Sequence, residues 1–71
     1  TQFQTYSLVK RALGNKKLLI VEGLFDALSI EQVVPKGDYD ILILNSVNNV
    51  HRVIQDGVLE GYERLVMALD N

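Results

Sequence analysis

The stretch that decides the fold is Leu18-Leu19-Ile20-Val21-Glu22-Gly23-Leu24-Phe25-Asp26-Ala27-Leu28-Ser29. Its four apolar residues at 18–21 predict a strand that is buried on both faces. Glu22 follows at the carboxyl end of that strand, where open α/β sheets bind their ligands. Gly23 allows a sharp turn because it has no Cβ. Asp26 lies in the first turn of the helix that we expect next, where the helix dipole favours negative charge.

The rest of the chain continues this alternation of strands and helices. We expect helices over 5–13 and 24–34, and a third helix that Asn45 or Ser46 caps and that ends by Gly61. We expect strands over 16–21 and 41–44, and a third from 63 or 64 to 69. Alternation of this kind predicts right-handed crossovers and a parallel sheet. We therefore predict one α/β domain over 1–71: a helical extension over 1–15, then a three-layer core over 16–71 whose three parallel strands lie in the order 2-1-3.

Length and composition exclude several classes of protein. The chain has 71 residues, enough for one domain at most, and 48% of them are hydrophobic, which argues against disorder. The absence of cysteine excludes a disulfide framework and a thiolate metal site, and a single histidine argues against zinc. The apolar runs are far shorter than a membrane span, and no signal segment is visible. We expect a cytoplasmic protein with no membrane partner.

Three strand ends carry the polar residues Glu22, Asn45 and Asp70. If the third strand lies beside the first, Glu22 and Asp70 face each other on strands about 4.8 Å apart. Asp26 leans over the same crevice from the helix that leaves the first strand. Three hard oxygen ligands suit Mg²⁺. Each acid also has a plain alternative: a solvated strand end for Glu22, a partner of the helix dipole for Asp26, and an incidental terminal acid for Asp70.

The string Val21-Glu22-Gly23-x-x-Asp26-x-Leu28-Ser29 resembles the first signature of the TOPRIM domain. This domain is shared by bacterial-type primases, type IA and II topoisomerases, and some nucleases and repair proteins. The aspartate four positions after the glutamate resembles the primase-like branch. The segment 41–47 resembles the second strand and turn of primase-like TOPRIM proteins from mobile elements. The end of the chain, 65–71, resembles the strand and first aspartate of the other signature, Asp-x-Asp. The resemblance covers residues 17–71.

This resemblance implies a Rossmann-like core and a role for each matching acid. Glu22 matches the glutamate that acts as a general acid/base in nucleotidyl transfer or strand cleavage, or as a metal ligand. Asp70 matches an Mg²⁺ ligand, and Asp26 matches the additional acid near the metal; Mn²⁺ is an alternative ion. The implied partners are DNA or RNA and nucleotides. The second aspartate of Asp-x-Asp has no counterpart, so we expect weak or no metal binding and no turnover by this chain alone.

The distribution of charge gives a second, smaller indication of nucleic-acid binding. The net charge is −2, which is not the composition of a general nucleic-acid-binding protein. Four basic residues nevertheless cluster before the first strand: Lys10, Arg11, Lys16 and Lys17. They form either a solvated polar face or a small edge that contacts phosphates, with Lys16 and Lys17 as the candidate nucleic-acid-binding residues. We expect Phe25 and Tyr62 to serve in packing.

Two functions of other classes compete with the TOPRIM interpretation. The chain could be a non-catalytic α/β interaction module with incidental acids, which predicts an exposed apolar patch at the third strand. A receiver-like regulatory fold ranks lowest, because it usually pairs two acids directly after the first strand, where this chain has Glu22 and Gly23. No helix is expected after the third strand, and a parallel sheet needs both faces covered. We therefore expect a folding unit incomplete at its C-terminus, which could self-associate through the uncovered face.

Overall fold

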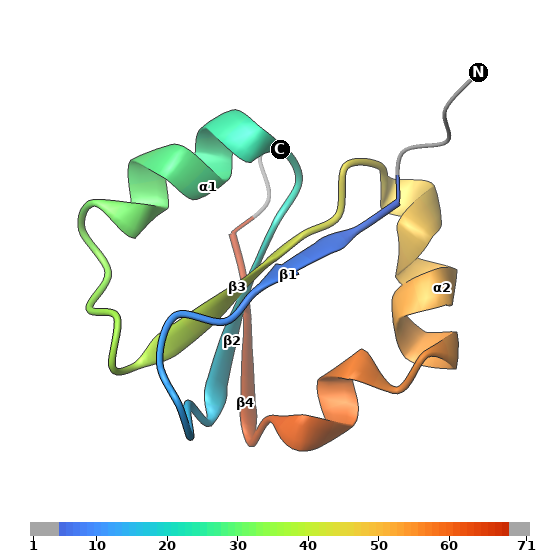
Figure 1. Cartoon of the computed structure of the whole chain (residues 1–71). Helices are drawn as coiled ribbons and strands as arrows, with labels where there is room; N and C mark the ends of the chain where they lie inside the picture. Colours follow the sequence, from blue (N-terminus) through green and yellow to red (C-terminus); the bar gives the residue numbers. More distant parts are fainter. Residues whose placement is uncertain (1–4, 69–71) are drawn as a thin grey trace.

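A computed structural model of the chain describes residues 5–68, which form one twisted sheet with a helix against each face (Figure 1). In this part of the chain the sheet has four strands in the order β1-β3-β2-β4. The elements, in chain order, are β1 (Ser7–Val9), β2 (Lys17–Val21), α1 (Leu24–Glu31), β3 (Tyr39–Ile43), the short 3₁₀ helix η1 (Val47–Asn49), α2 (Val50–Gln55), η2 (Val58–Gly61) and β4 (Arg64–Met67).

The order predicted for the three parallel strands is confirmed. Strand β2 lies between β3 and β4 and is parallel to both; its central residue Leu19 faces Ile41 on one side and Val66 on the other. The chain leaves β2 toward β3 through α1 and returns past β2 to β4 through α2. Because crossovers of this kind are right-handed, the two helices cover opposite faces. The α/β class and the three layers are therefore present, around a mixed sheet of four strands.

The helix predicted over 5–13 is wrong, and with it the helical extension over 1–15 in its described part. Residues 7–9 form a strand, β1, antiparallel to β3, with Leu8 opposite Leu42. Tyr6 and Leu8 pack on one face of the sheet and Val9 on the other. This is the two-residue alternation of a strand rather than the spacing of a helix. Pairing with β1 also covers the edge of β3 that a helix would have left open.

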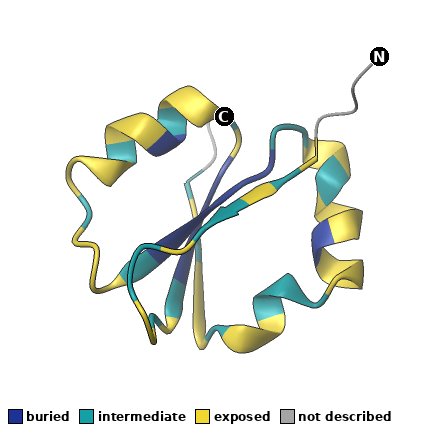
Figure 2. Cartoon of the chain, in the orientation of Figure 1, coloured by how far each residue is buried: buried dark blue, intermediate teal, exposed yellow. Residues whose placement is uncertain are grey.

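The core consists of two apolar layers, one on each face of the sheet. Along β2, Leu18 and Ile20 face α2, while Leu19 and Val21 face α1. Strand β3 alternates in the same way, and Figure 2 shows that these two strands are the buried centre of the molecule. Fully burying a side chain of this size contributes about 1.5–3 kcal/mol. The apolar runs at 18–21 and 41–44 therefore hold both helices on the sheet.

The helices are shorter than predicted. Helix α1 ends at Glu31, and the segment predicted as the third helix divides into η1, α2 and η2, with Gly57 at φ 73° between the last two. The predicted cap by Ser46 is confirmed, because its Oγ accepts a hydrogen bond from the main-chain N–H of Asn48 at 3.2 Å. No helix in the described residues is long and apolar enough to span a lipid bilayer.

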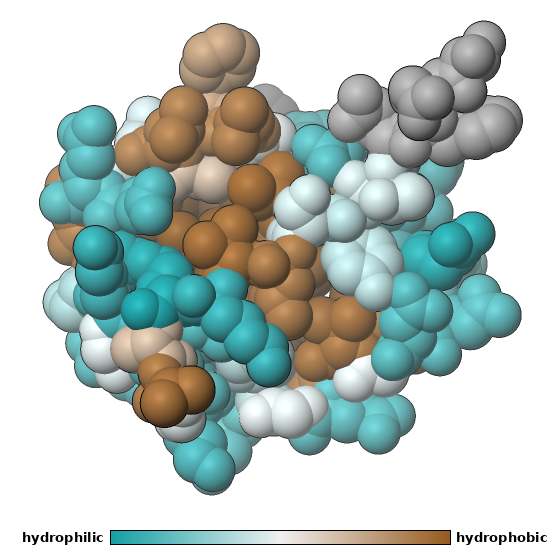
Figure 3. Space-filling model, viewed as in Figure 1, coloured by the Kyte–Doolittle hydropathy of each residue, from teal (hydrophilic) through white to brown (hydrophobic). Residues whose placement is uncertain are grey.

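Helix α1 also keeps apolar side chains on its outer surface. The prediction that Phe25 serves in packing is wrong: its side chain is 83% exposed, and Leu24 and Leu28 beside it are about half exposed. The space-filling view shows apolar atoms gathered over α1 (Figure 3). Only Ala27 of this helix is buried. The helix therefore rests on the sheet through a narrow contact.

Candidate functional site

Two of the predicted site residues lie at the carboxyl edge of the parallel strands. Glu22 directly follows β2, and its side chain is exposed. Its carbonyl oxygen accepts a hydrogen bond from the main-chain N–H of Asn45, the second residue after β3, at 2.7 Å. On the other side, the N–H of Ala68 after β4 donates to the Ile20 carbonyl at 2.8 Å. The hydrogen bond from Asn45 therefore fixes the main chain of Glu22, while the Glu22 side chain stays exposed.

Asp26 lies beside the same turn. It is in the first turn of α1 and is half-buried. A Cβ placed on Gly23 would lie 4.0 Å from the Asp26 Oδ2, so this carboxylate is folded back over the turn. The main-chain N–H of Ala27 closes the turn by donating to the Gly23 carbonyl at 3.2 Å. The short Glu-Gly-x-x-Asp segment thus brings both acids to one end of the sheet.

The third predicted ligand, Asp70, lies outside the described residues. Strand β4 ends at Met67, so the chain reaches Ala68 at the same edge of the sheet as Glu22. Within residues 5–68, no three His, Asp or Glu side chains are close enough together to hold a metal ion. A site formed by Glu22, Asp26 and Asp70 therefore stays a prediction, with two of its members placed.

Asn45 shapes the turn after β3. Its φ of 66° is in the left-handed region, which asparagine tolerates better than most residues. Its side-chain Nδ2 donates a hydrogen bond to the Thr5 carbonyl, and Asn49 Nδ2 donates to the Leu44 carbonyl at 2.7 Å. Of the two caps considered, Asn45 thus holds the segment before β1, and Ser46 caps the helical segment.

The two candidate nucleic-acid-binding lysines lie at the opposite end of β2. Lys16 is exposed, and the Lys17 ammonium stands 5.4 Å from the centre of the Tyr39 ring. A strand rises about 3.3 Å per residue, so roughly 16 Å of β2 separates Lys17 from Glu22. The structure therefore does not bring the lysines and the acids together, and a ligand touching both would have to run along the sheet.

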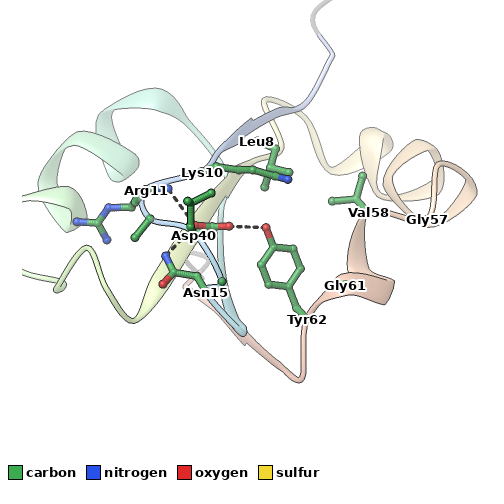
Figure 4. A pocket seen from close by; sticks show the side chains of 12 residues that line it. Leu8, Lys10, Arg11, Asn15, Asp40, Gly57, Val58, Gly61 and Tyr62 are labelled. Atoms are coloured by element: carbon green, nitrogen blue, oxygen red, sulfur yellow. Dashed lines mark hydrogen bonds between the residues drawn. The ribbon is translucent and has the colours of Figure 1, made fainter.

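Sequence reasoning missed a buried carboxylate near these lysines. Asp40, in β3, is only 3% exposed. It accepts hydrogen bonds from the Tyr62 hydroxyl at 2.6 Å, from Asn15 Nδ2 at 2.8 Å and from the Arg11 main-chain N–H at 2.9 Å (Figure 4). These donors come from segments 22 to 29 residues away along the chain. The only local feature of the sequence that could have indicated this buried carboxylate is the position of Asp40 directly before the apolar run at 41–44.

Arg11 extends this cluster to α1. Its guanidinium donates to the carbonyl oxygens of Glu31 at 3.0 Å and Val34 at 2.6 Å, just where α1 ends. A cation is favourable there because the last carbonyls of a helix lack partners within it. The loop between β1 and β2 therefore ties β3, α1 and Tyr62 together.

A hollow of about 560 Å³ lies beside Asp40, bordered by Leu8, Lys10, Val58 and Tyr62 (Figure 4). It is at the opposite end of the sheet from Glu22. The polar side chains of Asp40, Asn15 and Tyr62 on its wall already bond to one another. Since open α/β sheets bind ligands at the carboxyl ends of their strands, we interpret this cluster as structural and place the candidate site at Glu22.

The Tyr62–Asp40 pair makes stability depend on pH at the alkaline end. Burial, and then the hydrogen bond and charge of Asp40, raise the pKa of Tyr62 to about 12 from an ordinary value of 10.0. A raised pKa means that the contribution is complete below pH 10 and is lost as the pH rises to about 12. We expect Tyr62→Phe to be less stable than the parent at pH 8 and to lose less stability between pH 10 and 12.

Urea unfolding at a series of pH values measures this effect. Tyr39→Phe, which keeps the Tyr62–Asp40 pair, is the control and should retain the alkaline loss. An equal loss of stability in Tyr62→Phe and the parent would contradict the assignment of the alkaline loss to Tyr62.

At acid pH the same cluster makes stability depend on the protonation of Asp40. Burial alone would raise the pKa of this carboxyl, but its hydrogen bonds hold the pKa below the usual 3.8, so its contribution is lost only as the pH falls below that value.

Comparisons with known proteins give no match: no family model, curated protein or solved structure is significantly similar to this chain. The TOPRIM resemblance therefore rests on the motif residues themselves, and the fold and site rest on the geometry described above.

Proposed function

We propose that this chain is a TOPRIM-type α/β core of a primase-like DNA-metabolism protein, from a mobile element. In this proposal the carboxyl edge of its sheet binds Mg²⁺, or Mn²⁺, for nucleotidyl transfer or phosphodiester cleavage. One observation carries it: the exposed Glu22 ends the central strand while Asp26 is folded back over the same turn. The confirmed order β3-β2-β4 supports it, because Asp70 follows the strand next to Glu22.

The topology gives a physical reason for a ligand at this edge. The connection from β2 to β3, through α1, runs over one face of the sheet. The connection from β3 to β4, through α2, runs over the other face, so the two connections diverge at the carboxyl end of β2. Such divergence leaves a crevice above the strand ends. Carboxylate oxygens from Glu22, Asp26 and Asp70 are the ligand type that Mg²⁺ prefers.

The chemistry would then be divided between the ion and the chain. A bound divalent cation would neutralise charge on a phosphate of a nucleotide, DNA or RNA. Glu22, with its exposed carboxylate, would hold or move a proton. Lys16 and Lys17 would contact phosphates of a nucleic acid long enough to run along β2.

The test is a Mg²⁺ titration followed by amide NMR. We expect saturable shifts around residues 22–26 and at Asn45, with weak, millimolar-range affinity because the second aspartate of the Asp-x-Asp signature has no counterpart in this chain. Glu22→Gln should abolish the shifts. Glu31→Gln, an exposed acid at the far end of α1, should leave them unchanged. Equal shifts in all three proteins would overturn the proposal, as would a folded parent with none.

A second candidate function has its own observation. Leu65 and Met67 of β4 are 44% and 59% exposed, which is the apolar patch expected of an interaction module. In that case a partner would bind at β4, and Glu22→Gln would not affect the interaction. The two functions are therefore separable by the same variant.

A further inference from the structure

Strand β4 is an open edge of the sheet. In the part of the chain that the structure describes, its only strand partner is β2. The main-chain N–H of Arg64 donates to the carbonyl of Lys16, just before β2, at 3.3 Å, and that of Ala68 donates to the carbonyl of Ile20 in β2 at 2.8 Å. Because successive peptide groups of a strand alternate in direction, the N–H and C=O groups of Leu65 and Met67 point away from β2. They form a template for one more strand.

The side chains of the same two residues extend an apolar surface. Leu65 and Met67 lie on the α2 face, beside a hollow of about 150 Å³ whose wall includes Ile20, Val50 and Leu59 and has no polar surface. Val66, between them, packs on the α1 face. A strand that pairs with β4 would therefore meet apolar side chains on both faces.

We propose that the strand is β4 of a second copy of this chain, antiparallel about a two-fold axis that passes beside Val66. Such an axis is perpendicular to the sheet, so each side chain must oppose one from the same face. With Val66 opposite Val66 of the second copy, Leu65 lies opposite Met67 of that copy, and the reverse pair forms as well. The outward groups of these four residues then make four main-chain hydrogen bonds.

Other registers are worse for a four-residue strand. A shift that sets Leu65 against Val66 would oppose side chains from different faces. A register with Leu65 against Leu65 would set Met67 against Glu63, which places an acid beside an apolar side chain. The register centred on Val66 pairs the three apolar residues of β4 with one another and uses both of its outward-facing residues.

Charge complementarity also favours a second copy. In an antiparallel pair, the start of each β4 lies beside the end of the other. Arg64 would then oppose Ala68 of the second copy, at the sheet edge that carries Glu22 and Asp26. The exposed basic residue of each copy thus approaches the acidic edge of the other. This inference does not depend on metal binding or catalysis, so its failure would leave the proposed function standing.

Single cysteines test the register directly, because the chain has none of its own. In a non-hydrogen-bonded antiparallel pair the Cα atoms are about 4.5 Å apart, within the range that a disulfide bridges. We expect Val66→Cys to form a covalent dimer on mild oxidation at micromolar concentration. The matched variant Arg64→Cys, whose counterpart would be Ala68, should not. Equal cross-linking of both variants, or of neither, overturns the proposed register.

Unmodified protein gives a second readout. Sedimentation equilibrium should show a dimer, and Met67→Lys, which places two charges beside apolar partners, should weaken it at least about tenfold. Val33→Lys, on an exposed residue beyond α1, should not weaken the dimer.

Amide hydrogen exchange at Leu65 and Met67 should slow as the protein concentration rises, while exchange at Ala68, already bonded to β2, should change little. A monomer at millimolar concentration, or fast exchange at Leu65 and Met67 throughout, overturns the proposal.

Discussion

Asp40→Leu is expected to remove about 3–5 kcal/mol from the free energy of unfolding. The leucine offers no acceptor to the Tyr62 hydroxyl, the Asn15 amide or the Arg11 main-chain N–H, which all converge on the buried carboxylate. Each donor left buried without an acceptor costs about 1–3 kcal/mol. A domain of this size has a total stability of roughly 4–10 kcal/mol. The variant should therefore be largely or wholly unfolded in mild urea.

Urea unfolding followed by circular dichroism measures the loss. Asp38→Leu makes the same replacement two positions earlier, at an exposed residue, and should change stability by no more than about 0.5 kcal/mol. Asp40→Asn keeps one acceptor oxygen and should lie between the two. If Asp40→Leu were as stable as Asp38→Leu, the buried cluster would not be what holds the loop between β1 and β2 in place.

Leu42→Ala is expected to cost about 3 kcal/mol, within a usual range of 2–5 for this replacement in a core. Leu42 has no exposed surface and lies in β3, between β1 and β2. It belongs to the apolar layer under α2, together with Leu18 and Val53. A cavity there would face strands that are fixed by hydrogen bonds on both sides, so the surrounding structure has little freedom to close it.

The same replacement at Leu13 is the control. Leu13 is fully exposed in the loop between β1 and β2, so Leu13→Ala should change stability by less than about 0.5 kcal/mol. Thermal and urea unfolding of both variants measure the difference. Comparable losses in the two would mean that β3 is not the centre of the core.

The parallel part of the fold could be predicted because its information is local. The apolar runs at 18–21 and 41–44 are too short for helices and too continuous for a half-exposed strand. The segment before them could not be predicted in the same way, since Tyr6, Leu8 and Val9 fit either a helical stripe or an alternating strand. What decides between the two is the edge of β3, 32 or more residues later, with which β1 pairs.

The polar residues of the molecule also divide into those that the sequence could predict and those that it could not. Glu22 and Asp26 are four residues apart, and the turn that joins them is contained in the motif, so their proximity could be predicted. The cluster around Asp40 could not, because Tyr62, Asn15 and Arg11 reach it only after the whole sheet has formed. Asp70 lies outside the described residues, and its part in the site stays a prediction.

Mn²⁺ line broadening tests the central claim most directly, because a paramagnetic ion marks the amides nearest to it. With a trace of Mn²⁺ added to the parent chain, we predict selective broadening at residues 22–26, at Asn45 and at Ala68, and relief of it by excess Mg²⁺. The amides around Asp40 and Lys17, at the other end of the sheet, should stay sharp. Broadening centred on that other end, or spread evenly over the exposed acids, would contradict a divalent-metal site at the end of β2.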